Sequence, residues 1–93
     1  MKAVKINRGL LLTIRGKSKG DRQAIGWAIR NAQLHFGDPH SHRGTGIRKL
    51  SAKYYELRVG LDYRLIFTDE LTFLRFVEAG SHAQVKRFLK QHP

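Results

Sequence analysis

Between Gly46 and Phe67 the sequence places charged side chains where they could share one face of a β-sheet. The segment, GIRKLSAKYYELRVGLDYRLIF, contains two runs in which apolar residues recur at every second position. The charged residues that this alternation leaves on the other face are Lys53, Glu56, Arg58, Asp62 and Arg64. A sheet face with these side chains could bind a polyanion and cut it.

Cutting an RNA backbone requires a group that accepts the 2′-OH proton, a group that protonates the leaving oxygen, and positive charge on the phosphate. Arg64 is the candidate for the positive charge, because a guanidinium offers fixed, paired donors to phosphate. Its side chain should project from the sheet opposite the core-facing Tyr63 and Leu65. The alternative is a structural role, in which Arg64 pairs across the strands with Glu56 or Asp62. This chemistry needs no metal and no cofactor.

Proton transfer has two candidates. Histidine titrates near neutral pH, so His82 could give or take a proton, although it could also make only a local hydrogen bond at the start of a helix. Glu56 could accept the 2′-OH proton, because it alternates onto the same face as Arg58. The alternative for Glu56 is an ion pair with Arg58 or Arg64. The assignment of acid and base stays open.

Further residues could hold the RNA. The candidates for phosphate contacts are Arg48, Lys49, Lys53 and Arg58. Such contacts position a nucleic acid without reading its sequence, and the alternative for each residue is an ordinary solvated side chain. Phe88 could stack on a base, but it also fits the apolar side of the last helix.

The composition agrees with a nucleic-acid or acidic partner. The 93 residues include 18 Lys and Arg against 7 Asp and Glu, which gives a net charge of +11. A field of this strength attracts nucleic acid, ribosomal RNA or an acidic protein, although it also serves solubility. The chain has no cysteine, which excludes disulfides and thiolate metal sites. The longest apolar run near the N-terminus is Leu10 to Leu12, so we expect no membrane segment and a cytoplasmic location.

The first half of the chain predicts a short strand over residues 2–6 and a long helix. Residues 8–15 fit either a short helix or a continuation of that strand. Ser18 and Asp21 form a capping pair, after which Ile25, Ile29, Ala32 and Phe36 recur at helical spacing. Gly37 and Pro39 should end this helix, and residues 37–46 should form a polar loop.

The second half predicts a meander and a last helix. Strands are expected around 55–59 and 63–67, a third over 71–77, and a capping box at Ser81 and Gln84 should open a C-terminal helix with Val85, Phe88 and Leu89 on its apolar side. Short connections imply antiparallel pairing, so the class is α+β in a single domain over 1–93, with the helices on one face of the sheet.

Two short motifs carry less weight. His40-Ser41-His42 has a spacing that a metal could use, but no third type of ligand clusters nearby, so we expect no metal site. Gly44-Thr45-Gly46 is a turn and not a phosphate-binding loop, because no Gly-Lys-Ser/Thr follows it.

The meander pattern KL-x4-YELR-x4-YRLIF, followed by Gly80-Ser81-His82, resembles the RelE/ParE toxin superfamily. The likeness implies a RelE-like α+β fold with a short N-terminal strand, two helices, an antiparallel three-stranded meander and a C-terminal helix. It places Arg64 where the family has a catalytic arginine, and His82 where it often has His or Arg. Phe88 departs from the family, several of whose members have a tyrosine near this position, and the departure implies weaker cleavage.

The resemblance implies a toxin of a type II toxin–antitoxin module that cuts mRNA on the ribosome and is held inactive by a cognate antitoxin. The expected partners are therefore the antitoxin, the ribosome and mRNA. One alternative is a ParE-like toxin that inhibits DNA gyrase, for which the important residues would lie on the first two helices. The other is a basic binding module that keeps the RelE fold without catalysis.

Overall fold

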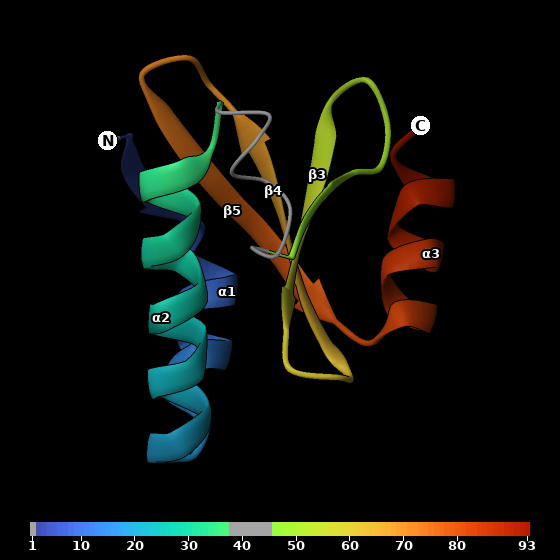
Figure 1. The fold of residues 1–93 in the computed structure, drawn as a ribbon. Helices are drawn as coiled ribbons and strands as arrows, with labels where there is room; N and C mark the ends of the chain where they lie inside the picture. Colours follow the sequence, from blue (N-terminus) through green and yellow to red (C-terminus); the bar gives the residue numbers. More distant parts are fainter. Residues whose placement is uncertain (1, 38–45) are drawn as a thin grey trace.

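The computed structural model describes residues 2–37 and 46–93, which form a five-stranded sheet with helices on both of its faces (Figure 1). The elements are β1 (Ala3–Ile6), α1 (Arg8–Arg15), α2 (Lys19–His35), β2 (Ile47–Lys49), β3 (Tyr54–Val59), β4 (Tyr63–Asp69), β5 (Phe73–Gly80) and α3 (His82–Gln91). This order confirms the predicted α+β arrangement of a short strand, two helices, a meander and a last helix. The segment over residues 8–15, which the pattern left open, is helical.

The predicted meander forms the centre of the sheet, whose strand order is β1-β5-β4-β3-β2. Strand β4 pairs antiparallel with β3 and β5, with Leu65 opposite both Leu57 and Ala79. The two edge strands are β1 and β2. The partner of β1 is distant in sequence, and β2 has only three residues, too few to predict from the pattern. Strand β1 joins β5 in parallel, and β2 extends β3 in antiparallel fashion.

Helix α2 begins and packs as its sequence predicts. The Ser18 side chain caps it by accepting a hydrogen bond from the Asp21 backbone N–H at 3.2 Å. Its buried residues are Ile25, Ile29 and Ala32, which lie on one face of the helix. The predicted stop at Pro39 and the histidine pair His40 and His42 lie outside the described residues.

The sheet has a large core on one side and a smaller one on the other. The larger cluster joins α1 and α2 to the sheet and consists of Leu10, Ile25, Ile29, Ala32, Leu57, Leu65, Phe67, Leu74 and Phe76. The smaller cluster, Tyr54, Ile66 and Val85, lies under α3. The prediction that all helices share one face is therefore wrong for α3, because Tyr54 and Ile66 give the second face an apolar patch that α3 covers (Figure 1).

A salt bridge ties the N-terminal end of the chain to the turn between β4 and β5. Lys2 Nζ lies 2.6 Å from Asp69 Oδ1 and donates a second hydrogen bond to the Leu71 carbonyl at 2.9 Å. Burial alone would raise the pKa of Asp69, but the hydrogen bonds from Lys2 and from the Leu71 N–H, with the charge of Lys2, lower it overall. A carboxyl whose pKa is lowered by folding stabilises the protein above its unfolded pKa of about 4 and loses that contribution in acid.

We expect Lys2→Met to lower the free energy of unfolding by about 0.5–1 kcal/mol at pH 7, because both partners are only partly buried. The difference from wild type should shrink as the pH falls from about 4 through the lowered pKa of Asp69. Urea unfolding at pH 7 and at low pH measures it. Lys5→Met is the control, because Lys5 Nζ lies over the Phe73 ring, 4.3 Å from its centroid. An effect of Lys2→Met that is equal at both pH values would contradict this role.

Candidate functional site

Arg64 and Glu56 form a buried ion pair on the α3 side of the sheet. Arg64 Nε lies 3.0 Å from Glu56 Oε1, and the two residues are 9% and 3% exposed. Arg64 projects opposite the core residue Leu65, as the alternation predicts. The cross-strand pairing that was the structural alternative for Arg64 is thus present.

Two arginines approach the Glu56 carboxylate, and a third is paired across the strands with one of them. Arg58 on β3 is directly opposite Arg64 on β4, and Arg48 on β2 is directly opposite Glu56. Arg48 Nε lies 3.8 Å from Glu56 Oε2 and is mostly exposed. We call Arg48, Arg58 and Arg64 with Glu56 the arginine cluster. Like charges that face each other across two strands repel, so the cluster favours a bound anion.

The pair between Arg64 and Glu56 has ion-pair distance without hydrogen-bond geometry. Arg64 Nε and Glu56 Oε1 are both buried, and within the described chain neither has a partner that meets the angular criteria of a hydrogen bond. A buried polar atom in this state needs an explanation, such as strain, a catalytic role, or a bound water or ion. Because Arg64 Nε faces Glu56 Oε1, a donor to a bound anion would have to come from the terminal nitrogens of the guanidinium.

The start of α3 adjoins the arginine cluster. Gly80 is opposite Arg64 in the pairing of β5 with β4, and α3 begins two residues later at His82, which is exposed. The predicted capping box is confirmed: the Ser81 N–H donates to Gln84 Oε1 at 2.7 Å and the Gln84 N–H donates to Ser81 Oγ at 3.3 Å. This box fixes the direction in which α3 leaves the sheet.

The predicted RNA-binding residues do not all lie on one face. Arg58 and Arg48 belong to the arginine cluster, and Lys53 Nζ lies 5.4 Å from the centroid of the Tyr54 ring on the α3 side. Lys49 is opposite Tyr55, whose ring packs with the larger core, and its Nζ lies 5.9 Å from that ring centroid. Lys49 therefore belongs to the other face, at the β2 edge.

Phe88, on α3, packs against the smaller core cluster and stacks on the ring of His92. Its centroid lies 5.1 Å from that of Tyr54 in an edge-on arrangement and 4.1 Å from that of His92, with the last two rings nearly parallel. His92 is exposed. His92 is not among the candidates drawn from the sequence, although its spacing of four residues from Phe88 predicts that the two rings are neighbours on a helix. A hollow of about 250 Å³ lies here, lined by Glu78, Ala79, Gln84, Arg87, Phe88, Gln91 and His92.

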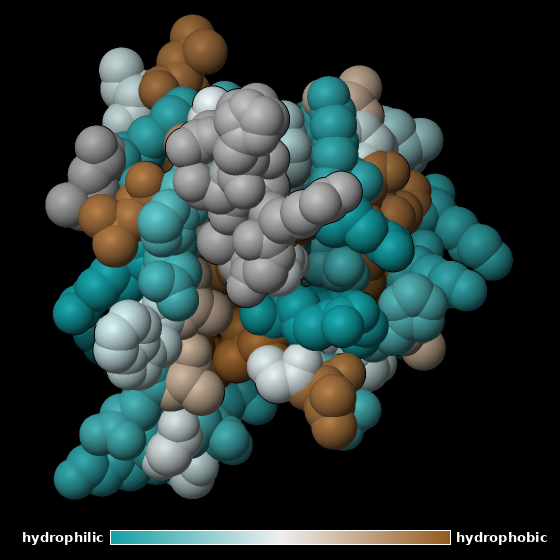
Figure 2. Space-filling view, in the orientation of Figure 1, coloured by the Kyte–Doolittle hydropathy of each residue, from teal (hydrophilic) through white to brown (hydrophobic). Residues whose placement is uncertain are grey.

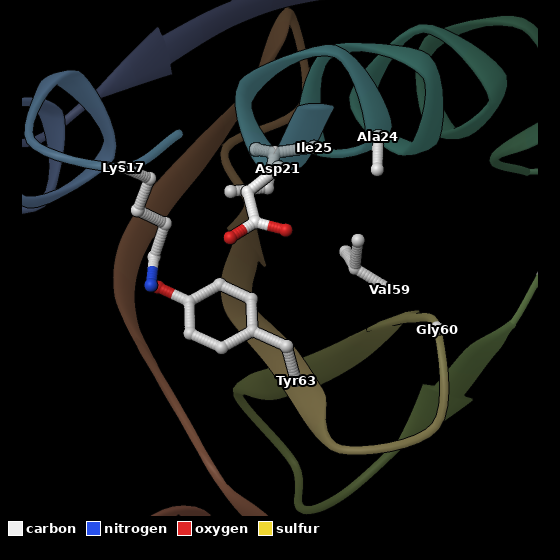
Figure 3. A pocket seen from close by; sticks show the side chains of 7 residues that line it. All are labelled: Lys17, Asp21, Ala24, Ile25, Val59, Gly60 and Tyr63. Atoms are coloured by element: carbon white, nitrogen blue, oxygen red, sulfur yellow. The ribbon is translucent and has the colours of Figure 1, made fainter. Parts of the chain in front are cut away.

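Another hollow, of about 210 Å³, lies on the opposite side of the sheet (Figure 3). Its lining residues are Lys17, Asp21, Ala24, Ile25, Val59, Gly60 and Tyr63. Lys17 Nζ lies 4.3 Å from the centroid of the Tyr63 ring. Burial, and then the negative charges of Glu78 and Asp21, raise the pKa of Tyr63, so its hydroxyl stays protonated at neutral pH. Tyr63 and Arg64 point to opposite faces, so this hollow is separate from the arginine cluster.

The surface seen in Figure 2 is largely hydrophilic, with apolar residues in small separate patches. The large apolar residues that are exposed are Leu12, Trp27, Leu34, Leu61 and Leu71. Trp27 on α2 is 66% exposed and lines a shallow hollow with Gln23, Gly26 and Arg30. Exposure of a tryptophan on this scale is common at protein-binding surfaces.

Residues 2–37 and 46–93 contain neither a cluster of metal ligands nor a membrane-spanning helix. No group of three or more His, Asp or Glu side chains is placed to hold a metal ion in this part of the chain. None of the helices that the structure describes is long and apolar enough to cross a membrane.

Comparison with known proteins supports the fold. No family model matches the sequence, and no curated protein matches it. Among solved structures, the chain is similar to one chain of the archaeal RelE-RelB complex from Pyrococcus horikoshii OT3, with a TM-score of 0.61 and 14% sequence identity. The match covers 89% of this chain and 97% of that one. The chain therefore has a RelE-like fold.

Proposed function

We propose that this protein is the toxin of a type II toxin–antitoxin module and cuts mRNA on the ribosome without a metal ion. The observation that carries the proposal is the arginine cluster, in which Arg58 is directly opposite Arg64 and Arg64 pairs with the buried Glu56. The similarity in fold to a chain of the RelE-RelB complex supports the class of protein.

In the proposed reaction, the phosphate between two nucleotides binds at Arg64 and Arg58. Arg64 offers donors that strengthen as negative charge develops on the phosphate during attack by the 2′-oxygen. His82, exposed at the start of α3, gives or takes a proton. The 2′-hydroxyl gives its proton to His82 or to water as its oxygen bonds to phosphorus. The bond from phosphorus to the 5′-oxygen breaks, and that oxygen takes up a proton from His82 or from water.

The surroundings of the cluster supply the grip on RNA. Arg48 and Lys53 are exposed on the α3 side and would hold neighbouring phosphates. Lys49 would contribute from the other face of the β2 edge strand. Phe88 is half-buried and covered by His92, so base stacking falls to the outer ring, His92, with Phe88 behind it.

The charge of the chain suits the proposed partners. A net charge of +11 favours binding to ribosomal RNA and mRNA, and it equally favours a cognate antitoxin with an acidic toxin-binding segment. Both lie in the cytoplasm, which is where we expect the protein to act.

The test is induced expression with mapping of the 5′ ends of cellular mRNA. Wild type should arrest growth and create new cuts within translated frames, whereas Arg64→Ala and the uncharged double variant Glu56→Gln/Arg64→Met should do neither. Arg30→Ala, an exposed arginine on α2, is the matched control and should act like wild type. An absence of new cuts in wild type would overturn the nuclease proposal, and an absence of arrest as well would leave a basic binding module.

A second candidate function is inhibition of DNA gyrase by a ParE-like toxin. The observation that favours it is the exposure of Trp27, with Leu12 and Leu34, on α1 and α2. Growth arrest without mRNA cuts that survives Arg64→Ala but is abolished by Trp27→Ala would support this function. Arrest that depends on Arg64 and not on Trp27 would exclude it.

A further inference from the structure

We infer that Glu56 is a positioning residue that fixes the guanidinium of Arg64, and not the general base of the proposed cleavage. The inference rests on the proposed function and refines the roles within the same site. The sequence is compatible with both roles for Glu56, and the surroundings of Glu56 in the folded chain distinguish them.

The buried Glu56 carboxylate is poorly accessible to the 2′-OH of a bound RNA. A general base has to come within about 2.6–3.2 Å of the hydroxyl that it deprotonates, directly or through one water. Glu56 is only 3% exposed, and its Oε1 is buried under the sheet face. A 2′-OH bound at the surface cannot reach that oxygen without moving Arg64.

Both oxygens of the Glu56 carboxylate already face arginines. Oε1 lies 3.0 Å from Arg64 Nε, and Oε2 lies 3.8 Å from Arg48 Nε. An incoming hydroxyl would have to break the buried ion pair with Arg64 at Oε1, or displace the mostly exposed Arg48 at Oε2. The geometry suits a carboxylate that holds cations.

Arg64 needs a partner that fixes the direction of its guanidinium. Arg58 is directly opposite Arg64 on the neighbouring strand, and the two positive charges repel. Arginine also has many rotamers, so without a fixed partner its donors would not stay in one direction. The Glu56 side chain reaches to 3.0 Å from Arg64 Nε and so orders the guanidinium against this repulsion, which pre-organises its donors for phosphate.

The two roles predict opposite orders of cleavage activity for Glu56→Gln and Glu56→Asp. Glutamine keeps the length of the side chain and an acceptor oxygen beside Arg64 Nε, but it cannot accept the 2′-OH proton. Aspartate can still accept a proton, but it is one methylene shorter and withdraws from Arg64. Positioning therefore predicts that Glu56→Gln is more active than Glu56→Asp, and general-base catalysis predicts the reverse.

The experiment is single-turnover cleavage of mRNA on programmed ribosomes over a range of pH, with Arg30→Ala as the matched control. We expect Glu56→Gln to lose less than about tenfold and to keep the wild-type pH profile, with a larger loss for Glu56→Asp. A loss of about 10²- to 10⁴-fold in Glu56→Gln, with one limb of the pH profile missing, would overturn the inference.

A readout without cleavage separates this inference from the proposed function. The Nε–H of a held, buried arginine gives a protected signal in ¹H–¹⁵N NMR, and Arg64→Lys identifies that signal by its loss. We expect the signal to stay protected in Glu56→Gln and to lose protection in Glu56→Asp. If wild type cleaves nothing, the nuclease proposal fails, and the NMR result alone decides whether Glu56 positions Arg64. Equal protection in wild type and Glu56→Asp would show that Glu56 does not hold Arg64.

Discussion

Arg64→Ala is expected to lower the free energy of unfolding by about 3 kcal/mol, because it leaves the Glu56 carboxylate buried without its nearest cation. Breaking a buried ion pair usually costs about 3–5 kcal/mol. We place this one at the lower end because Arg48 Nε still lies 3.8 Å from the other carboxylate oxygen. Since a domain of this size is stable by only about 5–15 kcal/mol in total, the effect is large.

Urea or guanidinium unfolding measures this loss, and two variants serve as controls. Glu56→Gln/Arg64→Met removes both charges at similar volume and should unfold close to wild type. Arg58→Ala removes the exposed arginine opposite Arg64 and should change stability by no more than about 0.5 kcal/mol. If Arg64→Ala were as stable as Arg58→Ala, the ion pair would not be buried in solution.

Phe67→Ala is expected to have the largest effect on the fold, a loss of about 4 kcal/mol. Phe67 is fully buried at the centre of the larger core. Its ring centroid lies 4.9 Å from that of Phe76, 5.4 Å from that of Tyr55 and 5.5 Å from that of Phe36. Alanine would leave a cavity that ring side chains fixed on a sheet cannot fill by moving.

Thermal and denaturant unfolding of Phe67→Ala test this directly. The matched control is Phe73→Ala on β5, because that ring is only half-buried and lies beneath the cations of Lys5 and Arg75. We expect Phe73→Ala to cost less than half as much. Equal losses in the two variants would contradict the placement of the core between the sheet and α2.

The features that could be predicted from sequence are set by residues close together in the chain. Ser18 and Ser81 both cap helices where their spacing from Asp21 and Gln84 predicts it. Alternation also places Arg64 opposite Leu65, on the face where the structure has it. Each of these depends on hydrogen bonds or side-chain directions within a few residues.

The features that could not be predicted depend on distant contacts. The parallel pairing of β1 with β5 joins segments about 70 residues apart, and four residues of sequence do not specify such a partner. Helix α3 lies on the face of the sheet opposite α2. There, Val85 of α3 packs against Tyr54 of β3 and Ile66 of β4, and the three residues form one apolar cluster. Alternation places Tyr54 and Ile66 on the face opposite the larger core, but it does not show that α3 covers that face.

Within the candidate site, the pattern predicts the face on which each residue of the meander lies but not how far it is buried. Glu56 and Arg58 alternate onto the same face, yet Glu56 is buried and Arg58 is exposed. The difference comes from the neighbouring strands, since Arg48 on β2 and Arg64 on β4 lie on either side of Glu56. Burial is what turns Glu56 from a candidate base into a candidate for positioning Arg64.

The most direct test of the central proposal, cleavage that depends on Arg64, uses purified protein with mRNA-programmed ribosomes in EDTA-free buffer and primer extension to locate cuts. We expect wild type and Arg30→Ala to cut the mRNA at the same positions. Glu56→Gln/Arg64→Met, which should remain folded, should cut at least about 10²-fold more slowly. Cutting by the double variant at the wild-type rate would contradict the role of the arginine cluster in the reaction.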